Sequence, residues 1–361
     1  MALLWCDGFD HYGTSARMTD GPYAEVVSSS FALSTTNPRT GTYCMRKQGV
    51  LTLDAYIRRV LGGSKTTVGL GLAVYMDHLP FANDAYCLYD FRDAGNVPQI
   101  SVVVQSTGTI AIKRGTAATG GGNTSTTLGT TSVPVVTANA YQHIETAVFF
   151  SNTVGTVEVR VNGVTVLSLT GVDTVYTANV ECSQVAVNCG CTGLSIQHFV
   201  TSDIDDIFCW DTTGSYNNTF IGDRRVLTLF PDANTATADW TAVGAASGYL
   251  CIDEANPNDD TDYISAATVG QVSQFGLQNL PSGISVVSAV VMVERARKTD
   301  AGTANTKVSV VSGASSAAGA DKPLTEIYTY RQDVFQTDPV SAAPFTPADV
   351  NALQFKVERT A

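Results

Sequence analysis

The stretch of residues 157–169, with the sequence VEVRVNGVTVLSL, decides the fold class. In its first half the valines share one face while Glu158 and Arg160 share the other, which is the period-two alternation of a half-buried strand. Asn162-Gly163 separates this run from a second alternating run. Because both central residues of a type I′ turn need positive φ, Asn-Gly is the strongest short-range hairpin signal. The stretch therefore predicts a β-hairpin.

Similar runs of β-branched and apolar residues predict strands along the rest of the chain. They lie at 68–76, 100–105, 109–113, 144–151, 285–293, 308–311 and 353–358. Helical periodicity is almost absent: residues 54–61 have room for two turns before Gly62-Gly63, and Thr346-Pro347 is an N-cap residue followed by a first-turn proline. Residues 115–139, rich in Thr, Gly, Ser and Ala, are interpreted as a long loop or hairpin tip, and residues 312–323 as a second loop. We therefore predict an all-β protein.

The length of 361 residues suits two domains better than one. Turn-forming residues cluster at 211–218, directly after a strong strand signal, and 224–230 resembles a strand that opens a new unit. We predict two tandem β-sandwich (jelly-roll) domains at 1–212 and 223–361, with a linker at 213–222.

Composition and charge exclude several function classes. Acidic residues outnumber basic ones by 33 to 21, and the net charge of −12 repels nucleic-acid phosphates. No apolar run approaches the ~20 residues that span a bilayer, so no membrane insertion is expected. The first residues lack the basic and apolar regions of a secretory signal, so we expect synthesis in the cytoplasm.

Eight cysteines are interpreted as buried, reduced thiols, because a chain of this size needs no disulfide staples. Two alternatives stay open. The first is a zinc site formed by Cys182, Cys189, Cys191 and Cys209, although their spacing departs from the paired C-x2-C knuckle. The second is that disulfide bonds form after the protein is released from the cell.

The sequence offers no catalytic constellation. It contains no P-loop, no G-x-S-x-G and no H-E-x-x-H motif. Glycoside hydrolysis needs two carboxylates flanking one bond, but Glu145 and Glu158 lie on separate predicted strands and Glu158 faces outward beside Arg160. The four histidines are interpreted as ordinary strand or loop residues. We predict no catalytic residue and a protein that is not an enzyme.

Two binding sites are predicted. Aromatic faces beside polar groups suit a glycan, and this mixture occurs at Tyr86, Tyr89, Arg92 and Asp93. The alternative there is a strand whose aromatic residues belong to the core. Hard oxygen ligands on a loop suit calcium, and we expect such a site at Asp253, Asp259, Asp260 and Asp262. The alternative there is a solvated acidic loop, and no other cofactor is expected.

The part of the chain from residue 1 to about residue 211 resembles a concanavalin A-like, laminin G-like jelly roll. The segments that carry the resemblance are Trp5–Tyr12, Tyr141–Glu145, Gly155–Gly163 and Asp203–Trp210. The first segment is similar to the opening strand of that class, and the last to its closing strand. The resemblance implies that these two strands pair side by side.

The remainder resembles a module of tailed-phage virion proteins. The similar segments are Trp240–Gly244, Asp260–Ile264, Phe275–Leu277, Ala296–Lys298 with Gly302, and Thr337–Pro339 followed by Phe345-Thr346. The family usually shows Trp where Phe345 stands.

The resemblance implies a non-enzymatic structural component of the virion, in the tail, the neck or collar, or the capsid decoration. Such a protein is assembled in the host cytoplasm, contacts other virion proteins and forms a homo-oligomer, since the particle is symmetric. The alternative function is binding of host-surface glycans for adhesion. The third hypothesis is that the protein is a polysaccharide depolymerase.

Overall fold

The computed structural model describes residues 2–26, 31–48, 56–82, 84–115, 125–192 and 200–361. The chain divides into two compact units, the first comprising 1–9 and 23–226 and the second 10–22 and 227–361. These bounds differ from the predicted ones, because residues 213–226 belong to the first unit and residues 10–22 to the second. The all-β fold class is confirmed, and each unit is built from antiparallel sheets.

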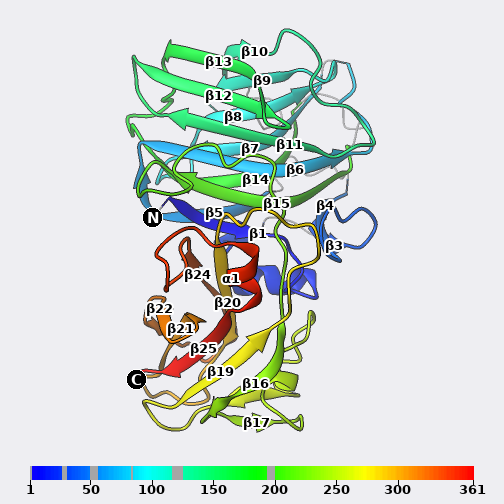
Figure 1. The fold of residues 1–361 in the computed structure, drawn as a ribbon. Helices are drawn as coiled ribbons and strands as arrows, with labels where there is room; N and C mark the ends of the chain where they lie inside the picture. Colours follow the sequence, from blue (N-terminus) through cyan, green and yellow to red (C-terminus); the bar gives the residue numbers. More distant parts are fainter. Residues whose placement is uncertain (1, 27–30, 49–55, 83, 116–124, 193–199) are drawn as a thin grey trace. The chain divides into compact units, whose positions relative to one another are not determined.

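Two sheets form the first unit, one layer behind the other in Figure 1. The eight-stranded sheet runs β13 (Val164–Val172), β12 (Gly155–Val161), β11 (Gln142–Phe149), β6 (Thr67–Met76), β15 (Ser202–Asp211), β4 (Cys44–Lys47) and β3 (Phe31–Ser34), with β1 (Leu3–Asp7) beside β15. The seven-stranded sheet runs β10 (Thr126–Thr130), β9 (Ile110–Arg114), β8 (Pro98–Gln105), β7 (Ala85–Arg92), β14 (Cys182–Thr192), β5 (Ile57–Lys65) and β2 (Glu25–Val26). The pairing of β1 with β15 is the one that the jelly-roll resemblance implied.

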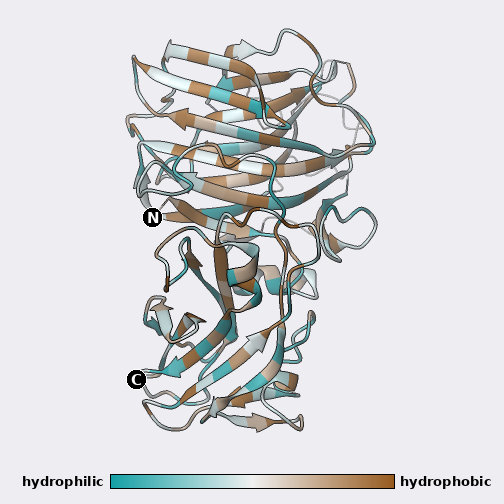
Figure 2. Ribbon diagram, viewed as in Figure 1, coloured by the Kyte–Doolittle hydropathy of each residue, from teal (hydrophilic) through white to brown (hydrophobic). Residues whose placement is uncertain are grey.

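The hairpin predicted from the deciding stretch is confirmed as β12–β13. Val161 pairs with Val164 around Asn162 and Gly163, whose φ angles are 49° and 82°. The β12 valines are buried between the sheets, whereas Glu158 and Arg160 are half-exposed on the other face. Figure 2 shows this alternation of apolar and polar residues along the strands of the sheet.

The second unit contains a smaller sheet in the order β16 (Pro231–Ala238), β19 (Val272–Leu277), β25 (Gln354–Arg359), β21 (Asn305–Ser312) and β22 (Ser315–Ala318), with β23 (Lys322–Pro323) beside β21. Two further pairs are β17 (Thr241–Val243) with β18 (Tyr263–Ser265), and β20 (Val290–Ala296) with β24 (Thr329–Phe335). The helices are η1 (Ser15–Asp20), η2 (Tyr249–Cys251) and α1 (Pro347–Asn351). Across the described residues, no helix has the length and apolar character to cross a membrane.

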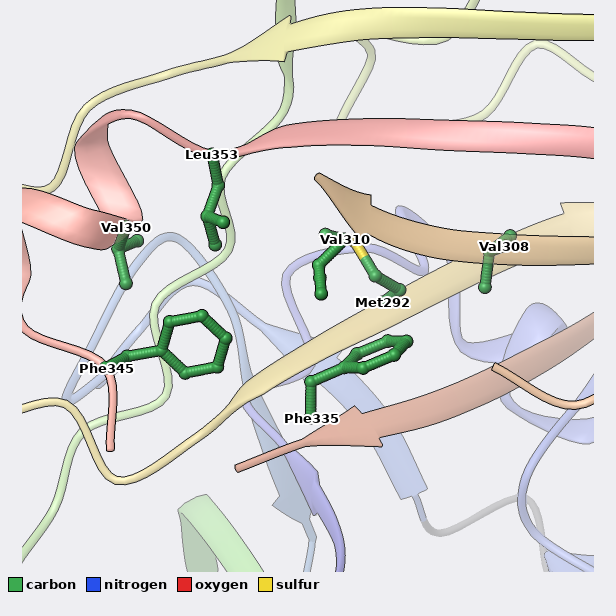
Figure 3. Packing of buried hydrophobic residues seen from close by; sticks show 7 residues of the cluster. All are labelled: Met292, Val308, Val310, Phe335, Phe345, Val350 and Leu353. Carbon is green, nitrogen blue, oxygen red and sulfur yellow. The ribbon is translucent and has the colours of Figure 1, made fainter. Parts of the chain in front are cut away.

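The core of the second unit gathers side chains from β20, β21, β24 and the α1 region. Figure 3 shows them pointing toward one another: Met292, Val308, Val310, Phe335, Phe345, Val350 and Leu353. Helix α1 confirms the predicted short helix, and a capping box begins it. The Thr346 hydroxyl accepts the Asp349 N–H at 3.2 Å, while the Asp349 carboxylate accepts the Thr346 N–H at 2.8 Å.

Three sequence predictions are wrong. Residues 57–61 do not form helical turns but begin β5, which pairs with β14 up to Val60 and again at Lys65, with a register shift where Gly62 and Gly63 lie. Strands β22 and β23 lie within 312–323, a stretch interpreted as a loop. Within 115–139, strand β10 pairs with β9 as an antiparallel hairpin, and residues 116–124 fall outside the described part of the chain. Residues 224–230 carry no strand pairing.

Candidate functional site

The outer face of the eight-stranded sheet carries a group of aromatic and ionisable side chains that lie close together. On β11 the Thr146 hydroxyl lies 2.7 Å from the Tyr89 hydroxyl of the opposite sheet, so Thr146 points into the core. Its neighbours along the strand therefore point outward, since strand side chains alternate. We call the resulting group the outer-face cluster, and it comprises His143, Glu145, Phe208 and Trp210.

Two glycines of β6 form the floor of the outer-face cluster. A Cβ on Gly71 would lie 2.4 Å from Cζ of Phe208, and one on Gly69 would lie 2.0 Å from Cε2 of Trp210. The missing side chains let both rings lie against the backbone of β6. The sequence analysis missed this role, although two glycines at alternate positions of an apolar strand are a signal for close approach of another group.

Glu145 is held by three N–H donors. Its carboxylate accepts the Trp210 indole N–H and the backbone N–H groups of Ile221 and Gly222, each at 2.9 Å. Burial raises the pKa of Glu145, and these donors together with Arg160 counteract that effect because they favour the charged form.

A segment of the chain, residues 220–226, covers the cluster, and we call it the covering segment. The Phe220 ring meets the Trp210 ring edge-on at 5.8 Å, and the Arg160 guanidinium lies 3.8 Å from the Phe220 ring centroid. At the other end of the segment the Val226 N–H donates to the Asp206 carboxylate at 2.8 Å. The chain itself therefore occupies this face of the sheet over the cluster.

His143 is buried beneath this cover and stacks on Phe208, with ring centroids 5.5 Å apart. Neither ring nitrogen has a hydrogen-bond partner within the described part of the chain. Burial lowers the pKa of His143 to about 4, although the nearby Asp223 acts in the opposite direction. The imidazole is therefore neutral at neutral pH.

Asp205 and Asp206 tie a loop to β15. The Asp205 carboxylate accepts the backbone N–H groups of Arg39 and Thr40 at 2.8 and 3.0 Å, and Asp206 forms an ion pair with Arg39 at 3.1 Å. Burial, reinforced by the charge of Asp206, raises the pKa of Asp205 to about 8. Both carboxylates thus serve the architecture around the outer-face cluster.

The predicted glycan residues lie inside the first unit. Tyr86, Tyr89, Arg92 and Asp93 are all buried. The Tyr86 hydroxyl lies 2.7 Å from the Ser202 hydroxyl, Arg92 donates to Asp90 at 2.9 Å, and Asp93 accepts the Thr177 hydroxyl at 2.8 Å. Their ring faces are not open to a sugar, so the structure corrects the prediction in favour of the core-aromatic alternative.

The predicted calcium loop belongs to the second unit and contains Asp253, Asp259, Asp260 and Asp262. Asp259 is bound by Arg17 at 3.3 Å and by Arg295 at 2.7 Å, and Asp260 is bound by Arg297 at 2.7 Å. Within the described residues, these four carboxylates do not converge on one point. The arginines already pair with carboxylate oxygens of Asp259 and Asp260 that a cation would need as ligands. The calcium site stays a prediction.

Comparisons with known proteins add a fold likeness only. No family model matches the chain. No curated protein matches it by sequence. Among solved structures, the chain is similar to a sialidase (13% identity, TM-score 0.40), of which it spans 18% with 58% of its own length. It is also similar to an alginate lyase, with 13% identity and a TM-score of 0.41 over 56% of this chain and 95% of the lyase. A third similar structure is domain 4 of an extracellular arabinanase from Geobacillus stearothermophilus, with 18% identity and a TM-score of 0.39 over 58% of this chain and 93% of that domain. At these values none of the likenesses assigns an activity to this chain.

Proposed function

We propose that the chain is a non-catalytic β-sandwich protein that acts through its surfaces, as a structural component of a tailed-phage particle. The covered outer-face cluster supports the non-catalytic part. A general acid or base must come within hydrogen-bond reach of a substrate, whereas the Glu145 carboxylate is engaged by three N–H groups of its own chain. The phage assignment rests on the sequence resemblance of the second unit.

The edge of the first unit supports contact with other subunits. Strand β13 lies at the end of the eight-stranded sheet, and its first residue, Val164, is 66% exposed. An edge strand has unpaired backbone groups that can pair with a strand of a neighbour. We expect the protein to contact other virion proteins and further copies of itself in this way.

A polysaccharide assay tests the non-catalytic part. The purified chain is incubated with alginate and with neutral and acidic bacterial polysaccharides, and reducing ends and unsaturated uronates are measured. We expect no product above the heat-treated control. Product formation that Glu145→Gln abolishes would overturn the proposal.

Particle labelling tests the structural role. Antibodies against the purified chain are applied to phage particles from the source culture and located by immunogold electron microscopy. We expect labels at one position on each particle, and sedimentation velocity should show a homo-oligomer. Labelling confined to material outside purified particles would contradict the assignment.

A second candidate function, glycan binding for adhesion, is supported by two half-exposed tyrosines at the end of the same sheet face. The rings of Tyr75 and Tyr141 lie 5.7 Å apart, and the Tyr75 hydroxyl donates to the Asn139 amide oxygen at 3.1 Å. Asn139 is exposed. Aromatic faces beside amide groups suit sugar rings and their hydroxyls.

A glycan array with matched variants tests this candidate. If it holds, wild-type protein binds a defined set of glycans and Tyr75→Ala weakens that binding at least about tenfold, which corresponds to the loss of about 1.4 kcal/mol. Tyr216→Ala is the control, because Tyr216 is exposed elsewhere in the first unit. Equal binding by both variants would exclude the Tyr75 surface.

A further inference from the structure

Three buried side chains of the seven-stranded sheet bring metal-ligand atoms together. They are Cys87 and Asp90 on β7 and Cys189 on β14, and their ligand atoms all lie within 4.8 Å of one another. The Cys87 sulfur lies 3.1 Å from a carboxylate oxygen of Asp90. Across the described parts of the chain, this is the one group of three or more such side chains that converges.

Irregularities in both strands produce this convergence. Cys87 and Asp90 are three residues apart, so a regular strand would direct them to opposite faces. The β7–β8 register shifts between Cys87 and Tyr89, which inserts one residue and returns Asp90 to the face of Cys87. A β-bulge of this kind re-aims side chains and is common near functional sites.

The facing strand is irregular at the same point. The β14–β7 register shifts between Val187 and Gly190. Within that interval Asn188 adopts a left-handed φ of 63°, and the φ of Gly190 is 101°. Such backbone persists only where the surrounding structure determines it. The two bulges thus coincide at the two cysteines.

We propose that Cys87, Asp90 and Cys189 form a binding site for Zn²⁺ or a similar thiophilic divalent cation. Thiolate bonds of about 2.3 Å and a carboxylate bond of about 2.0 Å place tetrahedral ligand atoms roughly 3.5–3.8 Å apart. The Cys87 sulfur and the Asp90 oxygen lie 3.1 Å apart and every pair lies within 4.8 Å, so the first pair would separate slightly and no pair would have to approach by more than about 1 Å. Two sulfur ligands select zinc over magnesium or calcium, and a water molecule would complete the tetrahedron.

The charges around the site suit such an ion. Arg92 donates to Asp90 at 2.9 Å, and its guanidinium lies 4.2 Å from the Tyr56 ring centroid. Binding of Zn²⁺ releases both thiol protons, because the thiolates are the ligands. Two thiolates, one carboxylate, a divalent cation and Arg92 then sum to zero, so the buried site exchanges protons for metal without gaining net charge.

Cobalt substitution of the whole 361-residue chain tests the site. Protein purified under reducing conditions and treated with a chelator is titrated with Co²⁺. We expect one equivalent to bind with tetrahedral d–d bands and a thiolate charge-transfer band, and Zn²⁺ to abolish both. Proton release measured in weak buffer should be two per ion.

Variants assign the ligands. Cys87→Ser, Cys189→Ser and Asp90→Asn should each raise the Kd for Co²⁺ by more than the roughly 10–100-fold that loss of a second-shell partner costs. Cys182→Ser is the matched control: Cys182 is also buried on β14, but its thiol donates to the Gln184 carbonyl. It should keep the wild-type spectrum.

Two results overturn the site, and neither depends on the variants folding or on the proposed function. One is a folded, fully reduced wild-type protein that shows no thiolate charge-transfer band with Co²⁺. The other is a Cys87–Cys189 disulfide in the peptide map of freshly isolated protein, which would assign the same geometry to a cross-link.

Discussion

Trp210 donates its indole N–H to the Glu145 carboxylate at 2.9 Å, across 65 residues of chain and across an intervening strand. Strand β6 lies between β15, which carries Trp210, and β11, which carries Glu145. The two side chains meet over β6 because Gly69 and Gly71 place no side chain between them. This bond also positions the carboxylate that holds the covering segment.

Glu145→Leu should destabilise the first unit. The change leaves three N–H donors without their acceptor, and an unsatisfied buried donor costs about 1–3 kcal/mol. We expect the free energy of unfolding to fall by at least about 2 kcal/mol in urea titrations. Glu158→Leu, which removes a half-exposed carboxylate paired with Arg160, should change it by less than about 0.5 kcal/mol. Equal losses would contradict the role of Glu145.

His143 should make the first unit acid-sensitive. Its folded-state pKa of about 4 lies below the ordinary 6.5, so the unfolded chain takes up the proton first as the pH falls. The resulting stability is present above about pH 6.5 and is lost as the pH falls toward about 4. His143→Phe keeps an aromatic ring against Phe208 and cannot take up a proton.

We therefore expect His143→Phe to match or exceed wild-type stability at neutral pH and to lose less on acidification, measured by urea unfolding at several pH values. Phe208→Leu is the control, because it removes the stacking partner and retains the imidazole. It should lower stability at every pH with the wild-type slope. Identical pH profiles for wild type and His143→Phe would refute the prediction.

Gly71→Ala should cost about 1–3 kcal/mol, as overpacking does, because its Cβ would lie 2.4 Å from the Phe208 ring. In a Phe208→Ala background the obstacle is absent, so the same change should cost almost nothing. A double-mutant cycle of unfolding free energies measures this coupling. The same cost in both backgrounds would show that the ring is not the reason for the glycine.

Arg295→Met should loosen residues 10–22 within the second unit. Arg295 binds Asp20 at 3.0 Å and Asp259 at 2.7 Å, and its loss leaves Arg17 as the described ion-pair partner of Asp259. We expect trypsin to cleave after Arg17 about fivefold faster, as a loss of about 1 kcal/mol implies. Arg297→Met, which removes the exposed pair with Asp260, should leave the rate unchanged. Equal rates for the two variants would contradict the prediction.

The sequence alone determined the features that depend on near neighbours in the chain. Period-two alternation and short apolar runs identified six strands of the first unit, namely β6, β8, β9, β11, β12 and β13, since each side chain's face follows from residues two positions away. Asn162-Gly163 located the hairpin because both residues needed positive φ. The Thr346 cap likewise located the one α-helix of the described chain.

Only the tertiary structure decided which of these elements serve a site. The sequence around Tyr86 and Tyr89 suggests an exposed sugar-binding surface, but packing of the opposite sheet buries both rings. The sequence of the covering segment predicted a linker followed by a strand, but in the structure Glu145 and Asp206 accept hydrogen bonds from its backbone N–H groups. Cys87 and Cys189 converge through bulges between strands distant in the chain. Such contacts depend on which strands pair and in what register, and no local pattern records that choice.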